Sequence, residues 1–198
     1  MKNIALLSEE QITMRMPKFA KAWLNWDTKQ SPMIRSAFKT DLAKIIQITQ
    51  ACAKHLCEME IFQWNENYPS LEAFEKDLSN DELFVLEIEG EIVGAIVIST
   101  RKDVVYEPIN WLTLDSTNGY LHRLCVHPEH QGKGHARALL DFAESYLKEL
   151  GAVSVRLDTF SKNLRNNKLY EARGYKRLGD VYFEQKSPFP FHCYEKLL

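Results

Sequence analysis

The chain has 198 residues, of which 45% are hydrophobic and 26% charged, and its formal net charge is −2. This length is enough for one folded domain with a sizeable core and an appendage, and the charge offers no basic excess to a nucleic-acid backbone. The four cysteines form no CxxC pair, and no segment approaches the roughly 18 apolar residues of a membrane span. We therefore expect a reduced, soluble, cytoplasmic protein without nucleic-acid or membrane partners.

Residues 1–32 are expected to form a helical extension. Ser8 can cap a helix over 8–26, where apolar residues recur at helical spacing and Pro17 introduces a kink. A strand candidate begins at Met33 after a polar connection, so we divide the chain into this extension and a main domain over 33–198. The extension can be a simple appendage or an interaction element.

The first half of the main domain is predicted to contain two helices and three strands. Thr40 or Asp41 can cap the first helix, and Ser70 the second. Two β-rich runs on either side of Gly90 predict a hairpin. In chain order we expect a strand at 33–38, a helix at 40–56, a helix after Ser70, a hairpin within 82–100 and an irregular loop at 101–119.

The second half alternates strands and helices. Pro128 closes a strand, Gly151 ends a long helix with one apolar face, and Gly174 ends a shorter helix. The expected strands lie at 120–128, 152–160, 175–185 and 189–198, and the expected helices at 135–150 and 163–173. The mixed order of strands and helices predicts an α/β sheet of six or seven strands.

The stretch HPEHQGKGHARALL at 127–140 places Gly132 and Gly134 before a helix. The glycines alone are compatible with an ordinary turn. A metal site is disfavoured, because His122 and His127 should point to opposite faces of one strand and no usual ligand spacing occurs. A strand, a glycine turn and a helix N-terminus in this order can instead bind phosphate groups.

The loop also fits the signature Q/R-x-x-G-x-G/A, with Gln131, Gly134 and Ala136 at its defined positions. With this loop and the later stretch NLRNNKLYEARGYKRLG, the chain resembles the GNAT superfamily of acetyl-CoA-dependent N-acetyltransferases. The resemblance covers about residues 33–198. It implies a mixed, mostly antiparallel sheet of six or seven strands flanked by about four helices, acetyl-CoA as cosubstrate, and no metal.

The resemblance implies where the cosubstrate lies. The backbone of Leu124, Cys125 and Val126 would follow the pantetheine arm, and the Val126 amide would donate to the oxyanion. Asn163 is either a contact of coenzyme A or a plain helix cap. The pyrophosphate would bind the loop amides, which belong to Gln131, Gly132, Lys133, Gly134, His135 and Ala136.

Two side chains are candidates for the chemistry. By resemblance, Tyr170 of the LYE element protonates the departing thiolate, although it can also be a tyrosine packed at a helix end. Many relatives place a glutamate base on the strand before the loop, where this chain has His122. This histidine can accept a proton directly or through water, or it can be structural. Asn166 stands where the family pattern has alanine.

The connection between the first two helices carries Gln63, Trp64 and Tyr68, where relatives build a substrate wall. Trp64 can equally be a core residue. We expect a monomeric or homodimeric N-acetyltransferase that acts by direct attack of a primary amine of a small molecule or peptide. The alternatives are transfer of another acyl group and a non-catalytic acyl-CoA-binding sensor.

Overall fold

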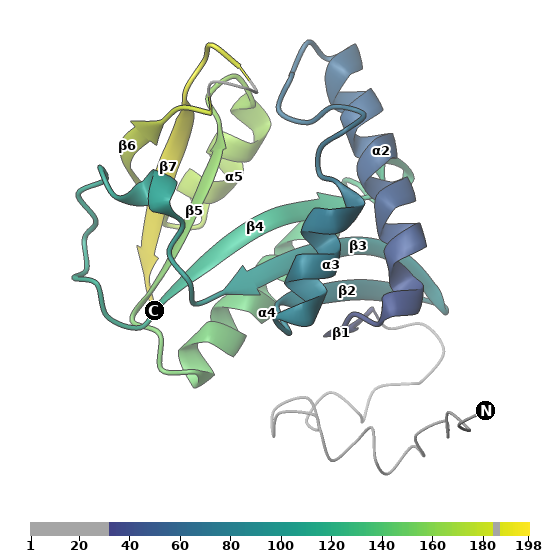
Figure 1. Ribbon diagram of the computed structural model, residues 1–198, viewed down its shortest axis with the longest axis horizontal. Coiled ribbons are helices and arrows are strands. Elements are labelled where there is room, and N and C mark those ends of the chain that lie inside the picture. Colours follow the sequence, from purple (N-terminus) through teal and green to yellow (C-terminus); the bar gives the residue numbers. More distant parts are fainter. Residues whose placement is uncertain (1–31, 184–186) are drawn as a thin grey trace.

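The computed structural model describes residues 32–183 and 187–198. The predicted helix at 8–26, and nearly all of the extension, lie outside the described residues. Within them, the expected mixed and mostly antiparallel sheet is confirmed, with seven strands in the order β1-β2-β3-β4-β5-β7-β6 (Figure 1). The strands are β1 (Met33–Ser36), β2 (Leu83–Ile88), β3 (Glu91–Ser99), β4 (Asn118–Val126), β5 (Ser154–Phe160), β6 (Lys176–Val181) and β7 (Phe191–Leu197).

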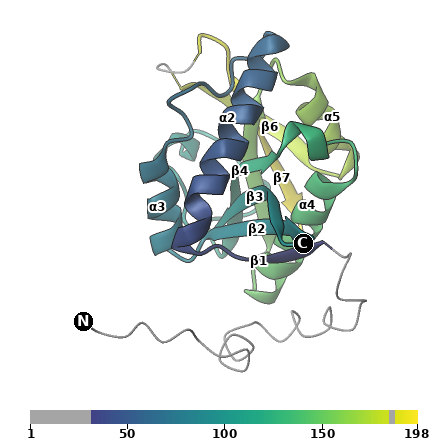
Figure 2. The same ribbon diagram turned by 90° about the vertical axis from the view of Figure 1, so that its right-hand side faces the viewer.

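Four α-helices in the described residues cover the sheet, as expected. On one face, α2 (Leu42–Glu58) and α3 (Leu71–Ser79) pack on the β1–β4 half of the sheet. On the other face lie α4 (His135–Glu149) and α5 (Leu164–Ala172). Figure 2 shows the sheet between these two helical layers. On the same face as α2 and α3, the β5–β7–β6 half of the sheet is covered by the segment 100–117. This segment includes the short helix η3 (Val104–Tyr106).

Local capping explains several helix ends. Ser70 accepts a hydrogen bond from the Ala73 N–H at 3.3 Å, as the sequence predicts. Asp41 directly precedes α2 but does not cap it. Its carboxylate instead accepts a hydrogen bond from Phe38 N at 2.7 Å and pairs with Arg35. The short β1 strand and the start of α2 are therefore joined by one carboxylate.

Two irregularities of β4 shape the middle of the sheet. Opposite β3, the pairing shifts from Val97↔His122 to Ala95↔Cys125, which makes a β-bulge. Arg123 lies in this bulge with φ 51°, a left-handed backbone that a non-glycine residue seldom adopts. On its other side, β4 runs parallel to β5, and this pairing ends at Leu121↔Leu157. Beyond that point the two strands diverge, and we call this place the fork (Figure 1).

Candidate active site

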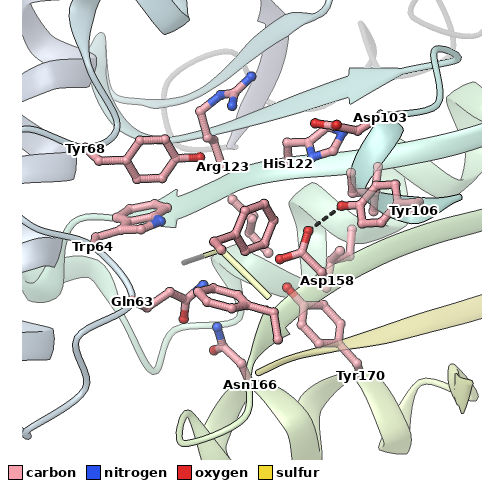
Figure 3. Close-up of a pocket in the computed structure, with 15 residues that line it drawn as sticks. Gln63, Trp64, Tyr68, Asp103, Tyr106, His122, Arg123, Asp158, Asn166 and Tyr170 are labelled. Atoms are coloured by element: carbon pink, nitrogen blue, oxygen red, sulfur yellow. Dashed lines mark hydrogen bonds between the residues drawn. The ribbon is translucent and has the colours of Figure 1, made fainter. Parts of the chain in front are cut away.

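A cavity of about 150 Å³ opens at the fork. It brings together six residues that the sequence singled out, from three separate parts of the chain (Figure 3). These are Gln63, Trp64, Tyr68, His122, Leu124 and Tyr170. The lining also includes Asn166, which replaces the alanine of the family pattern, and four polar residues that the sequence did not predict, namely Asp103, Tyr106, Arg123 and Asp158.

Tyr170 and His122 reach the cavity from opposite faces of the sheet. Tyr170 belongs to α5 and packs in the core with Leu157 and Tyr194. His122 lies on the other face, where its ring stacks on that of Tyr106 with centroids 6.2 Å apart. A group placed in the fork between β4 and β5 is therefore within reach of a phenol from one side and an imidazole from the other.

Tyr170 is only 6% exposed, and its environment favours the protonated phenol. Burial raises its pKa above the usual range, and the negative charge of Asp158 raises it further. Figure 3 shows the phenol pointing toward Asp158. At neutral pH this side chain is a hydrogen-bond donor, and it has a proton to give.

Asp158 is held by Tyr106. The Tyr106 hydroxyl donates to Asp158 Oδ1, and the Tyr106 ring also stacks on Tyr120, with centroids 5.9 Å apart. Burial and the Asp158 charge keep the pKa of Tyr106 well above its usual value, so it stays a donor. Because side chains alternate along a strand, the sequence could have placed Asp158 on the same face of β5 as Arg156. No local pattern predicts that Tyr106, from the segment 100–117, contacts this carboxylate.

The glycine loop ends in the N-terminus of α4. Gly132 and Gly134 have φ of 76° and 87°, and a Cβ built on either would meet no atom within 4 Å. The first helical hydrogen bond runs from Ala138 N to the Gly134 carbonyl at 3.0 Å. The N–H groups of the preceding turn thus have no acceptor inside the helix. This arrangement can bind an anion such as a phosphate.

A family model described as acetyltransferase (GNAT) family matches residues 49–175, which span β4, the glycine loop, α4, β5 and α5. This chain belongs to that family. The family places the chain among the acyltransferases, and the resemblance noted from the two motifs is confirmed.

Individual relatives agree with the family assignment. The human N-acetyltransferase 8B is 30% identical over 100 residues, which cover 50% of this chain and 40% of that protein. The chain therefore spans less than half the length of this relative. A GNAT acetyltransferase from Streptococcus agalactiae has the same fold, with TM-score 0.73 and 20% identity over 85% of this chain and 96% of its own. A putative acetyltransferase from Salmonella typhimurium, solved with acetyl-CoA, has TM-score 0.63 and 20% identity over 85% and 94% of the two chains.

The GNAT loop is tied to the neighbouring elements through Gln131. Its side-chain amide donates to the Val126 carbonyl at 3.0 Å, and its side-chain oxygen accepts from Arg165 at 2.8 Å. The Val126 carbonyl also accepts from the Cys52 thiol at 3.2 Å. Gln131 thus links the end of β4 to α5. Its side chain is engaged within the protein, whereas the loop presents backbone.

Not all of the predicted cosubstrate residues present their side chains to the cavity. Cys125 is 4% exposed and packs in the core beneath α2, so only its backbone can follow a ligand along β4. Asn163 caps α5 by accepting from Asn166 N at 3.1 Å, and its amide donates to Gln63 Oε1 at 3.0 Å. It therefore joins α5 to the connection between α2 and α3. Trp64, at 8% exposure, is both a core residue and part of the cavity lining.

The histidines of the loop lie close together, but in the described residues no group of three or more His, Cys, Asp and Glu is arranged to hold a metal ion. The rings of His127 and His130 are 6.1 Å apart, and those of His130 and His135 are 6.4 Å apart. The sequence argument that His122 and His127 alternate across one strand was wrong. The bulge at Arg123 breaks the alternation, and His127 lies beyond the end of β4.

Over the parts of the chain that the structure describes, no helix combines the length and apolar character needed to cross a bilayer.

Proposed function

We propose that residues 33–198 form an N-acetyltransferase domain that moves an acetyl group from acetyl-CoA to a primary amine of a small molecule or peptide. The observation that carries this proposal is the meeting of Tyr170 and His122 at the fork, from opposite faces of the sheet. The acetyl-CoA present in the Salmonella relative of the same fold supports the choice of cosubstrate.

The residues of the glycine loop fit the pyrophosphate of coenzyme A. The Gln131 N–H, which the sequence assigned to the anion, donates to the Pro128 carbonyl at 3.2 Å. The anion would therefore bind N–H groups from Gly132 to Ala136, and the missing Cβ atoms of Gly132 and Gly134 let it approach the backbone. Between the fork and the loop, β4 has no β5 partner over 122–126, so the backbone of Leu124 and Val126 can pair with an extended pantetheine arm. When bound, acetyl-CoA supplies the acetyl group as a thioester.

Tyr170 and His122 can act as acid and base because they reach the cavity from opposite faces of the sheet. His122 takes a proton from the acceptor ammonium, directly or through one water, and leaves a neutral amine. The amine nitrogen forms a bond to the thioester carbonyl carbon, and the Val126 N–H donates to the oxygen that becomes negative. The C–S bond then breaks, and the Tyr170 phenol gives its proton to the sulfur. The phenol recovers a proton from the new amide nitrogen, and His122 releases its own to solvent.

The acceptor would lie against the connection between α2 and α3. Gln63, Trp64 and Tyr68 line the cavity on that side, and Gln63 is held in place by Asn163. An aromatic wall offers rigid contact area for the carbon chain that carries the amine.

An acceptor screen tests the proposal. The full chain is incubated with acetyl-CoA and a broad panel of primary amines and peptides, and release of the coenzyme A thiol is recorded. Acetylation of at least one amine, confirmed by mass spectrometry, is the expected result. Stabilisation by acetyl-CoA without thiol release would instead favour an acyl-CoA-binding sensor, and turnover restricted to another acyl-CoA would correct the transferred group. Absence of any thermal shift with acetyl-CoA would contradict the cosubstrate assignment.

A further inference from the structure

Asn163 uses its side chain inside the protein. The residue is 3% exposed, and it does not line the cavity. Its Oδ1 accepts from Asn166 N at 3.1 Å, and its Nδ2 donates to Gln63 Oε1 at 3.0 Å. Both polar atoms of this carboxamide are therefore engaged in capping α5 and in holding the connection between α2 and α3.

Asn166, three residues later, has a carboxamide that the fold does not use. It stands where the family pattern has alanine, and its partly buried side chain lines the cavity. Its backbone N–H is bonded to Asn163, but within the described part of the chain its side-chain amide has no hydrogen-bond partner. This amide offers two N–H donors and a carbonyl acceptor to a ligand in the cavity.

The helix α5 connects the glycine loop with the fork. In its first turn, Arg165 Nη1 donates to Gln131 Oε1 of the loop at 2.8 Å. Near its other end, Tyr170 lines the cavity at the fork, and Asn166 lies between these two positions (Figure 3). Leu124 lines the cavity from β4, beyond the last residue of that strand that pairs with β5. An extended chain that joins the loop to the fork thus passes between the backbone of β4 and the helix α5.

We propose that the Asn166 carboxamide hydrogen-bonds the pantetheine amide nearest to the thioester, and thereby increases the affinity of this chain for acetyl-CoA. The inference rests on the proposed function and adds a contact that an alanine cannot make. Asn166 and Tyr170 share one face of α5, with about 5 to 6 Å between their Cβ atoms. Two methylene groups separate the sulfur of coenzyme A from this amide, which is a comparable length. With the Tyr170 phenol at the sulfur, the Asn166 side chain therefore reaches the amide.

The hydrogen-bonding needs of the arm agree with this placement. An amide that leaves water for a protein cavity loses free energy unless its N–H and its carbonyl find new partners. The backbone of β4 can bind the polar groups that face the strand. Asn166 can donate to, or accept from, the groups that face α5. Alanine at this position would leave that second side of the arm without a protein partner.

Calorimetric titration of Asn166→Ala tests the contact without any need for turnover. The Kd for coenzyme A should rise at least about fivefold. The Kd for 3′-phospho-ADP, which has the same nucleotide but no pantetheine arm, should stay within about twofold of wild type. Asn80→Ala is the matched control, because Asn80 follows α3 outside the cavity, and it should leave both values unchanged.

A second variant separates hydrogen bonding from packing. Asn166→Leu keeps a side chain of similar size without polar atoms, and it should weaken binding of coenzyme A as much as alanine does. Thermal unfolding checks that both variants fold, which we expect because alanine and leucine are strong helix formers. In NMR spectra of the wild type, the side-chain NH₂ signals of Asn166 should shift with coenzyme A and stay in place with 3′-phospho-ADP.

Several results would overturn the inference. An unchanged Kd for coenzyme A in Asn166→Ala, or wild-type affinity in Asn166→Leu, would show that no hydrogen bond to the arm contributes. Equal weakening of coenzyme A and 3′-phospho-ADP would place the effect at the loop. A raised KM for the amine alone would make Asn166 an acceptor contact. Wild type that binds no coenzyme A would contradict the proposed function itself, whereas binding that ignores Asn166 contradicts only this inference.

Discussion

Arg156 and Glu195 form a fully buried ion pair, with Arg156 Nε donating to Glu195 Oε1 at 3.0 Å across β5 and β7. The same carboxylate accepts from Leu112 N, Thr113 Oγ1 and Ser154 Oγ. The guanidinium in turn donates to the Thr113 carbonyl at 2.8 Å. This pair therefore fastens the segment 100–117 to the sheet, and that segment brings Tyr106 to Asp158.

Replacing Glu195 by alanine should lower the free energy of unfolding by about 3 to 5 kcal/mol, because it leaves the buried Arg156 guanidinium with only the exposed carboxylate of Asp115, at 3.3 Å, as a counter-ion. Urea unfolding followed by circular dichroism measures this change. Arg177→Ala is the matched control, since the side chains of the Arg177–Asp180 pair are 47% and 29% exposed and its loss should cost no more than about 1 kcal/mol. Equal losses in the two variants would show that the buried pair does not anchor the segment.

The ionisation of Glu195 should make stability depend on pH. Burial alone would raise its pKa, but the hydrogen bonds from Ser154, Thr113 and Arg156 outweigh burial and leave the pKa below the ordinary value. A depressed carboxyl pKa adds stability above the unfolded value of about 4.3, and this contribution is lost as pH falls through the folded pKa. The urea midpoint should drop below about pH 4.5, and the drop should be smaller in Glu195→Gln. A parallel decline in both proteins would assign it to other carboxylates.

Gly134→Ala should weaken binding of coenzyme A about tenfold, because a methyl group would enter the space in which the loop amides face the anion. The control is Gly90→Ala in the β2–β3 turn. Both glycines have left-handed φ, 87° and 82°, and neither has an atom within 4 Å of a built Cβ. The backbone strain is thus comparable, and only the first substitution should change the affinity measured by calorimetry. Equal affinities in the two variants would contradict the loop assignment.

Tyr170→Phe should lower kcat about 100-fold or more while leaving the KM for acetyl-CoA nearly unchanged. Tyr175→Phe removes a hydroxyl from a ring 5.8 Å away that bonds Glu144 outside the cavity, and its kcat should stay near that of wild type. Because burial and Asp158 raise the pKa of Tyr170, its loss of a proton should not limit kcat up to about pH 10. Unchanged turnover in Tyr170→Phe would remove it as the acid.

The four cysteines should differ in reactivity. Cys57 is exposed, whereas Cys52, Cys125 and Cys193 are buried. Burial raises the pKa of Cys52 to about 11 and raises those of Cys125 and Cys193 as well, so little thiolate forms at neutral pH. Titration of the native protein with a disulfide reagent should detect one fast thiol, and Cys57→Ser should abolish it. Two or more fast thiols in native protein would show that a buried cysteine opens to solvent.

Many helix ends and turns could be predicted from the sequence, because they depend on chemistry within a few residues. The Ser70 cap, the turn at Gly90 and the stop at Gly151 each depend on neighbours within a few residues, and each element lies where it was expected. Asp41 shows the limit. It lies directly before α2, but its carboxylate binds Phe38 N and Arg35 instead of the amides at the start of the helix. Because Arg35 belongs to β1, this choice of partner depends on where β1 lies.

The family, the order of the elements and the glycine loop could all be predicted from the amino-acid sequence, because strand, turn and helix signals are periodic and local. Only the tertiary structure revealed the fork, where one bulge at Arg123 and the end of one strand pairing bring His122 and Asp158 together. It also set Tyr106 against Asp158, although 52 residues separate them. Such contacts depend on register between distant strands, and no local pattern encodes that register.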